Sequence, residues 1–213
     1  VCHAEVAGGV YTQWGRGVSC SNGHTSIYTG TIMAAYHNHP AKSEFVCVDY
    51  ARESHGAGST QNSEGMLWYD TAASGGSMDS TLYPGSTLLG CSVCLAPLPV
   101  YTRWGSNGCT GGSTLLYKGI AAGSHYDHTG GGANALCLHT EPQPPDGWDT
   151  AGHTNALLYG TEYTSGKSDQ LDAACAVCQA DVAGDVYTQW GRGVSCSNGH
   201  ATMYTGTVMA DNY

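Results

Sequence analysis

Val10-Tyr-Thr-Gln-Trp-Gly-Arg-Gly-Val-Ser-Cys-Ser-Asn-Gly-His24 is the stretch that organises this chain, because the same letters return at residues 186–200. A third copy, with one change in its opening, is Val100-Tyr-Thr-Arg-Trp-Gly105. The copies contain β-branched and aromatic residues, as strands do, and the two faithful ones carry Asn-Gly, a dipeptide typical of tight hairpin turns. The motif therefore predicts a repeated β unit.

Cysteines accompany each copy at fixed places. One precedes the motif (Cys2, Cys94 and Cys178), one follows it (Cys20, Cys109 and Cys196), and two more belong to each full unit (Cys47 with Cys91, and Cys137 with Cys175). This order predicts repeat 1 at residues 1–91, with a front half at 1–40 and a back half at 41–91. Repeat 2 follows at 92–175, and a truncated repeat 3, a front half only, at 176–213.

Ten cysteines in such a chain favour disulfides and an oxidising compartment. The two CxxC elements, Cys91–Cys94 and Cys175–Cys178, would also suit zinc, but the remaining cysteines lie too far apart for a zinc ribbon. If front-half cysteines pair with each other, none is left over. The predicted bridges are Cys2–Cys20, Cys47–Cys91, Cys94–Cys109, Cys137–Cys175 and Cys178–Cys196, with an interchain bridge as the alternative.

Segments rich in β-branched and aromatic residues predict strands at 26–33, 66–69, 114–120 and 157–159. Gly, Ser and Pro predict loops at 54–65 and 141–154, and a short helix would fit only at 168–180. The predicted fold is all-β, an irregular, glycine-rich, disulfide-stapled tandem repeat with little or no helix. The third front half is expected to complete a β layer begun by the second back half, or to do so in a partner subunit.

Composition and charge exclude several functions. A net charge of -10 with seven cations argues against nucleic acid as a partner, and no apolar run is long enough to predict a membrane span. The start lacks Met and any signal-like stretch, so Val1 is expected to be a processed N-terminus. With every cysteine bridged and no GxSxG, HExxH or P-loop motif, neither an enzyme nor a cofactor is expected.

The motif and one loop together resemble a known family. Val100–Gly105 and the run from Leu115 to Cys137, which includes His125-Tyr-Asp-His-Thr-Gly-Gly-Gly-Ala-Asn134, resemble the cysteine-rich non-collagenous region of invertebrate short-chain, spongin-like collagens. Cys175-Ala-Val-Cys178 and Phe45-Val-Cys-Val-Asp49 belong to the same pattern. Related segments occur in secreted mantle and shell proteins of bivalves, some of which behave as lectins. The resemblance implies a secreted, extracellular module, although this chain has no Gly-X-Y collagen tract.

Arginine supplies the first candidate binding residues. Three of the four arginines, Arg16, Arg103 and Arg192, lie in the motif beside Trp and Tyr. An aromatic ring next to a guanidinium suits a sugar, because the ring stacks on its apolar face while the guanidinium binds a carboxylate or hydroxyls. The alternative is structural, with Trp in the core and Arg stacked over it.

Histidine-rich loops supply the second set. The Gly-rich loop after residue 123 and its counterpart after residue 35 present polar groups as binding loops often do. Only His39 and His128 correspond when the repeats are aligned on Cys47 and Cys137, so paired metal sites are the weaker interpretation and structural loop histidines the plain one. The candidate ligand-binding residues are Trp14, Arg16, Arg103 and Trp104 in the motif, and Tyr36, His37, His39, His125, Tyr126, Asp127, His128 and Asn134 in the loops.

Two functions from different classes follow. The first is a secreted lectin that recognises galactose-type or acidic (uronic) sugars through repeated shallow sites, whose weak affinities add through multivalency. The second is an extracellular-matrix or shell-matrix structural protein without specific sugar binding. The absence of an N-x-S/T sequon and of a collagen tract favours the lectin. Glycans or glycoconjugates are the expected partners, in a homo- or hetero-oligomer with disulfide links between chains as an option.

Overall fold

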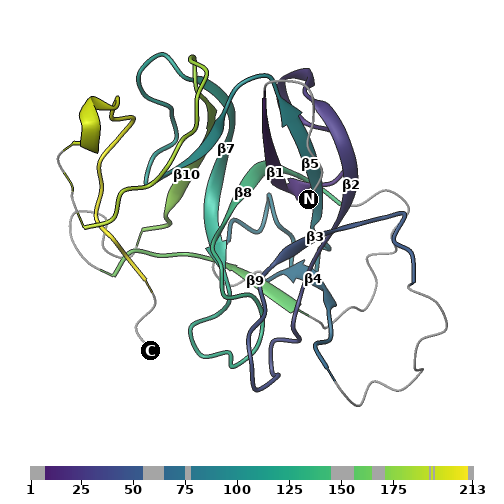
Figure 1. Cartoon of the computed structure of the whole chain (residues 1–213). Helices are drawn as coiled ribbons and strands as arrows, with labels where there is room; N and C mark the ends of the chain where they lie inside the picture. Colours follow the sequence, from purple (N-terminus) through teal and green to yellow (C-terminus); the bar gives the residue numbers. More distant parts are fainter. Residues whose placement is uncertain are drawn as a thin grey trace.

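The regular secondary structure of the described residues is almost entirely β-strand (Figure 1). The computed structural model describes residues 8–54, 65–74, 78–144, 156–164, 171–191, 193 and 195–210. Its strands are β1 (Gly9–Arg16), β2 (Thr25–Ala34), β3 (Val46–Asp49), β4 (Tyr69–Ala73), β5 (Gly90–Ala96), β6 (Val100–Trp104), β7 (Thr114–Gly123), β8 (Leu136–Gln143), β9 (Ala156–Gly160) and β10 (Ala174–Gln179). The only helical elements in this part are two short 3-10 turns, η1 (Ser21–Gly23) and η3 (Ser197–Gly199). The all-β prediction is confirmed.

None of the helices in the described residues is long and apolar enough to cross a bilayer.

Each CxxC segment forms a strand that lies between the two strands of the preceding front half. β5 pairs antiparallel with both β1 and β2, so that Cys94 lies opposite Tyr11 on one side and Ser26 on the other. β10 pairs in the same way with β6 and β7. β5 therefore spans the expected boundary between residues 91 and 92, and the sheet has no break there.

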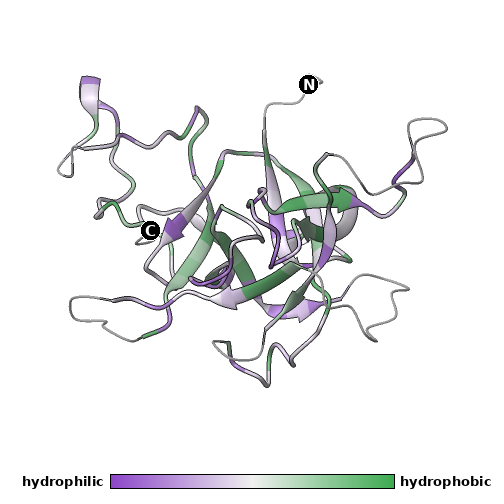
Figure 2. Ribbon diagram, turned by 90° about the horizontal axis from the view of Figure 1, so that it is seen from below, coloured by the Kyte–Doolittle hydropathy of each residue, from purple (hydrophilic) through white to green (hydrophobic). Residues whose placement is uncertain are grey.

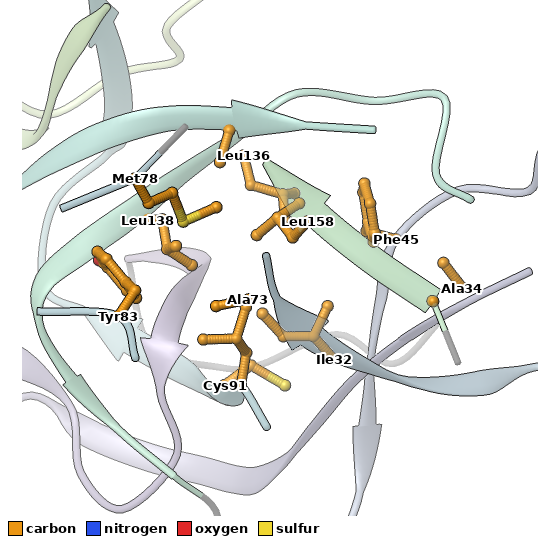
Figure 3. Packing of buried hydrophobic residues seen from close by; sticks show 13 residues of the cluster. Ile32, Ala34, Phe45, Ala73, Met78, Tyr83, Cys91, Leu136, Leu138 and Leu158 are labelled. Atoms are coloured by element: carbon orange, nitrogen blue, oxygen red, sulfur yellow. The ribbon is translucent and has the colours of Figure 1, made fainter. Parts of the chain in front are cut away.

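The strands enclose one main core (Figure 3). β8 pairs with β7 and β1, and β9 pairs with both β4 and β7, so the path β7-β8-β1-β5-β2-β4-β9 returns to β7. Ile32, Phe45, Leu136 and Leu158 point into the enclosed space from four different segments and are almost fully buried. Figure 2 shows the same arrangement as hydrophobic strands at the centre and hydrophilic segments toward the outside.

Four disulfides join the described cysteines, and they correct the predicted pairing in part. Cys47–Cys91 and Cys137–Cys175 are confirmed. The bridges Cys20–Cys94 and Cys109–Cys178 replace three predicted ones, Cys2–Cys20, Cys94–Cys109 and Cys178–Cys196. Cys196 is a free thiol, and Cys2 lies outside the described residues. Four disulfides are typical of extracellular proteins.

Strand geometry explains the correction. Residues three apart in a strand face opposite sides of the sheet, so the two thiols of a CxxC strand cannot share one partner region. Cys91 faces the main core with Cys47, while Cys94 faces a second buried cluster with Cys20. The prediction paired front-half cysteines that are close in sequence. In the structure β5 lies between β1 and β2, and its Cys94 reaches Cys20 in the turn that joins them.

The repeated motif encodes a turn at the end of its first strand. The buried Gln13 amide donates to the Ser19 carbonyl (2.7 Å) and accepts from the backbone and hydroxyl of Ser21 (2.9 and 2.6 Å). Gly15 has φ 86°, a backbone conformation that favours glycine, which accounts for Trp-Gly in every copy. Asn22 and Gly23 also have positive φ, as the predicted tight turn requires.

Other local predictions fare unevenly. The predicted strands at 26–33, 114–120 and 157–159 match β2, β7 and β9, whereas 66–68 precede β4. The short helix at 168–180 is wrong, because its described part contains β10. Of the predicted loops, residues 55–64 and 145–154 lie outside the described residues, and 141–143 extend β8. No described residue between 182 and 210 belongs to a strand, so the third front half completes no layer in this chain.

Candidate functional site

The two histidine-rich loops, residues 35–45 after β2 and 124–134 after β7, interlock side by side at the lower end of the molecule (Figure 1). Gly130 N–H donates to the His37 carbonyl (3.0 Å), Ser43 N–H donates to the Gly131 carbonyl (2.9 Å), and Ala133 N–H donates to the Ser43 carbonyl (2.7 Å). The loops of different repeats therefore form one surface.

The glycine run in the second loop permits this close approach. A Cβ on Gly130 would lie 2.0 Å from the Tyr36 carbonyl oxygen, and one on Gly132 would lie 2.1 Å from the ring of the buried Phe45. Any side chain at either position would push the loops apart. Gly130 and Gly132 are thus required by packing between the loops.

Asn134, a candidate ligand contact, is engaged in the same junction. Its amide oxygen accepts from Phe45 N–H (2.7 Å) and its amide nitrogen donates to the Phe45 carbonyl (3.3 Å). Both backbone groups of a buried residue are satisfied by this one side chain. The structure gives Asn134 a positioning role.

Two groups of three rings, each with two rings from a loop and one from a neighbouring strand, lie at the interlocked loops, and we call them ring triads. In triad 1, the ring centroid of Tyr36 lies 5.4 Å from that of His39 and 5.6 Å from that of Tyr69. The centroids of His39 and Tyr69 are 5.5 Å apart.

Triad 2 consists of His125, His128 and Tyr159. The ring centroid of His125 lies 4.8 Å from that of His128 and 4.9 Å from that of Tyr159, and the centroids of His128 and Tyr159 are 5.5 Å apart. All six rings of the two triads are half-buried, so each triad has a face toward solvent.

The triads occupy matching places in the two repeats. Ala34 pairs with Tyr69 between β2 and β4, and Gly123 pairs with Tyr159 between β7 and β9. The same tight turn follows in each loop, where His39 N–H donates to the Tyr36 carbonyl and His128 N–H to the His125 carbonyl. The sequence alignment that pairs His39 with His128 agrees with this placement, but it gave no indication that Tyr69 and Tyr159 would join them.

His37 connects the triads. Its ring lies 4.3 Å from that of Tyr36 and 4.9 Å from that of His128. Tyr126, which stacks on His125 at 4.4 Å, is 70 % exposed, and Asp127 is exposed beside it. The structure therefore brings all the loop candidates except Asn134 onto one surface.

Charge at this surface is tuned by burial and by neighbouring cations. Burial first, and then the nearby His37 and His125 imidazoles, lower the pKa of His128, with a smaller lowering from Lys42 and an opposing effect of Asp127. His128 Nδ1 is buried and makes no hydrogen bond. At neutral pH the His128 imidazole is therefore uncharged, which suits it to stacking.

The motif residues of repeat 1 lie elsewhere. Trp14 is half-buried and packs against the main core, and Arg16 forms a salt bridge with the exposed Glu141 (3.1 Å). Arg16 pairs across the sheet with Gln143, at the far end of β8 from the histidine loops. The length of β8 separates Arg16 from the histidine loops by about 23 Å.

Arg103 takes the position of Gln13, not that of Arg16. Its guanidinium donates to the Gly108 carbonyl (2.8 Å) and so closes the turn of its own front half. Trp104 is 42 % exposed at the end of β6, and Arg192 lies outside the described residues. An aligned comparison of the motif copies already contains this signal, because Arg103 stands where Gln13 and Gln189 stand.

Arg16 does line a shallow depression of about 510 Å³. Asn22, Lys118, His139 and Glu141 are also on its walls. Lys118 and Asn22 were not among the candidates. A signal for Lys118 existed in the sequence, because it is the one charged residue of the predicted strand at 114–120. The two cations could receive a carboxylate here, but the Arg16–Glu141 pair already occupies one of them.

No group of three or more His, Cys, Asp or Glu side chains in the described part of the chain is arranged to hold a metal ion. Comparison with known protein families finds no family model that matches the chain, and comparison with curated proteins finds no match either.

Proposed function

We propose that this protein is a secreted carbohydrate-binding protein whose sites are the two ring triads. The observation that carries the proposal is the pair of half-buried ring groups at matching places in the two repeats. The three partly exposed rings of each triad are inclined to one another by 50–81° in triad 1 and 41–75° in triad 2, and they offer ring faces on which a sugar can stack, with polar edges beside them. The resemblance of the second loop to segments of lectin-like mantle proteins supports the same function.

The residues around the triads favour galactose-type or uronic sugars. The apolar face of such a sugar would stack on the rings, and its hydroxyls would meet Tyr hydroxyls, imidazole nitrogens and the Asp127 carboxylate. The positive charge of Lys42 acts on His128, so a uronate carboxylate would also be attracted to triad 2. Arg16 and Arg103 are not part of this site, because both serve the sheet and its turns.

Two shallow sites in one chain suit multivalent recognition. Each would bind a single sugar weakly, and a glycan surface that engages both would be held about 10²–10⁴ times more tightly. Triad 1 has two tyrosines and one histidine, and triad 2 has one tyrosine and two histidines. The two sites would therefore differ in their dependence on pH.

A glycan array probed with the whole chain tests the proposal. We expect binding to galactose-type or uronic glycans, strong loss in Tyr69→Ala, Tyr159→Ala together, and partial loss in either alone. Tyr163→Ala removes a half-buried tyrosine outside the triads and is the matched control. No binding to either class of glycan, or undiminished binding in the double variant, would overturn the proposal.

A matrix structural protein is the second candidate. It is favoured by one observation, the large exposed hydrophobic side chains in residues 182–210. A surface of this kind points to assembly and is compatible with sugar binding at the triads, which lie at the other end of the repeats.

A further inference from the structure

The depression that Arg16 lines is built by both repeats. Repeat 1 supplies Arg16 from the end of β1 and the turn at residues 20–22, and repeat 2 supplies residues 116–118 of β7 and 139–141 of β8. The Asn22 amide donates to the Leu115 carbonyl (3.3 Å), which fixes the turn against β7. The volume of about 510 Å³ lies in the range of small-molecule sites and exceeds what an inorganic anion needs.

The two cations of the depression have donors to spare. The Arg16 guanidinium donates through Nη1 to Glu141 Oε2, and its Nε is buried with no hydrogen-bond partner among the described residues. Lys118 is exposed and forms no ion pair with any residue that the structure describes. The chain has a net charge of -10 and only seven cations, so two of them on the walls of one depression form a local exception.

The repeat itself does not require this pair. Lys118 stands where the other two copies have threonine, in Tyr28-Thr-Gly30 and Tyr204-Thr-Gly206. At the next junction along the chain, the places of Arg16 and Lys118 are taken by Ser106 and Thr205. The two cations therefore occur together only where the first front half meets β7, and the shared fold of the copies does not account for them.

Glu141 indicates which anion the depression accepts. Its carboxylate contacts Arg16 through one oxygen at 3.1 Å, and its side chain is 77 % exposed. An ion pair with so exposed a partner contributes little to stability, so a second carboxylate can replace it. A ligand carboxylate would also gain Lys118 and the unpaired edge of the guanidinium, whose planar fork matches two carboxylate oxygens.

The remaining walls suit a ligand that carries hydroxyl groups. Ser21 and Thr140 present hydroxyls, Asn22 presents an amide and His139 an imidazole. Such groups both donate and accept hydrogen bonds, as sugar hydroxyls do. The combination of a paired cation site with neutral polar walls therefore favours a hydroxylated carboxylic acid over a simple carboxylate.

We propose that this depression binds a hexuronate, the carboxylate form of a hexose, as a site separate from the ring triads. The carboxylate displaces Glu141 and lies between Arg16 and Lys118. The sugar hydroxyls meet Asn22 and Thr140. The site lies at the opposite end of β8 from the histidine loops, so it does not depend on sugar binding by the triads.

NMR of the full chain tests the proposal, with the His139 imidazole as the reporter because it lines the depression. Galacturonate added at pH 7 and constant ionic strength should move the His139 ring signals and reach saturation. Galactose lacks the carboxylate and acetate lacks the hydroxyls, so neither should move these signals over the same concentration range.

Two exposed side chains then give opposite effects on the affinity. Lys118→Gln removes a charged hydrogen-bond donor and should weaken galacturonate binding about tenfold. Glu141→Gln removes the competing carboxylate and should strengthen binding about threefold. Arg52→Gln and Glu53→Gln make the same charge changes at exposed positions after β3 that do not line the depression, and they should leave the affinity unchanged.

Four results would overturn the proposal. They are His139 signals that galacturonate does not move, equal movement with acetate, an unchanged affinity in Lys118→Gln or in Glu141→Gln, and loss of the movement in the Tyr69→Ala, Tyr159→Ala double variant. The last result would place the sugar at the triads. Persistence of the movement in that variant is the expected outcome, whether or not the triads bind sugars.

Discussion

The imidazole rings of His37 and His128 lie 4.9 Å apart, centroid to centroid, and they belong to different repeats. The contact exists because the loops of the two repeats interlock through Gly130 and Ser43. It joins the two ring triads into one surface. The electrostatic state of triad 2 therefore depends on His37 of the other repeat.

The first prediction concerns this contact. Burial and two neighbouring imidazoles lower the pKa of His128, so we expect it to titrate below 6.5 in an NMR pH titration. His37→Gln removes one of the neighbours, and the pKa of His128 should rise while staying below 6.5, because the burial remains. His200→Gln, in the C-terminal segment, should leave the His128 pKa unchanged. A wild-type value at or above 6.5 would refute this account of the site.

Close packing between the loops gives the second prediction. Gly132→Ala would place a methyl group against the ring of Phe45, and overpacking of this kind destabilises by about 1–3 kcal/mol. Gly123→Ala is the matched control, since a Cβ there meets nothing within 4 Å, and its effect should stay within about 0.5 kcal/mol. Denaturant unfolding of the oxidised protein measures both. Equal free energies of unfolding would mean that the loops are not interlocked.

The third prediction assigns Asn134 to structure. Asn134→Ala leaves both backbone groups of the buried Phe45 without partners and should lower the free energy of unfolding by about 1–3 kcal/mol. Asn38→Ala, on the exposed turn of the other loop, is the control and should change it by less than about 0.5 kcal/mol. Unchanged stability together with lost sugar binding would restore Asn134 as a ligand contact.

The sequence could predict what is local or what repeats. Residue types alone indicated strands, the Asn22-Gly23 turn, and the correspondence of His39 with His128. The bridges Cys47–Cys91 and Cys137–Cys175 were also predicted correctly. These features depend on neighbouring residues or on the alignment of copies.

Features that depend on strand order could not be predicted. Nothing local shows that β5 lies between β1 and β2, and this insertion decides that Cys20 meets Cys94. Tyr69 and Tyr159 joined the candidate site for the same reason, because their strands pair with the ends of β2 and β7. Arg16 and the histidine loops were both candidates for sugar binding, but they lie at opposite ends of β8.

The fourth prediction concerns acid stability. Burial, and then the Arg16 guanidinium, lower the pKa of His139 from 6.5 to about 4, against the opposing effect of Glu141. Between pH 6.5 and pH 4 the unfolded chain therefore binds a proton at this histidine and the folded chain does not. The free energy of unfolding consequently decreases as the pH falls from 6.5 toward 4. Between pH 7 and pH 5 the loss is about 2 kcal/mol.

Denaturant unfolding of the wild type and of His139→Gln at both pH values measures this loss. The variant should be less stable at pH 7, because the imidazole stacks on the buried Tyr117 at 4.8 Å, but its decrease on acidification should be about 2 kcal/mol smaller. His200→Gln, in the C-terminal segment, controls for a general effect of removing a histidine. An unchanged pH dependence in His139→Gln would assign the acid sensitivity to other groups.

The last prediction compares two truncations that end only a few residues apart. A chain ending at Asp181 keeps β10 and all four bridges, and loses three contacts of the C-terminal segment: Thr110 with Met203, Tyr204 with Thr102, and the Tyr101–Tyr204 stack. We expect it to be monomeric in size-exclusion chromatography and to unfold cooperatively. A chain ending at Cys175 loses most of the strand between β6 and β7 and the partner of Cys109, so both strands gain open edges and it should aggregate. Aggregation of the longer truncation would show that the sheet requires the third front half, and a soluble shorter one would show that β10 is dispensable.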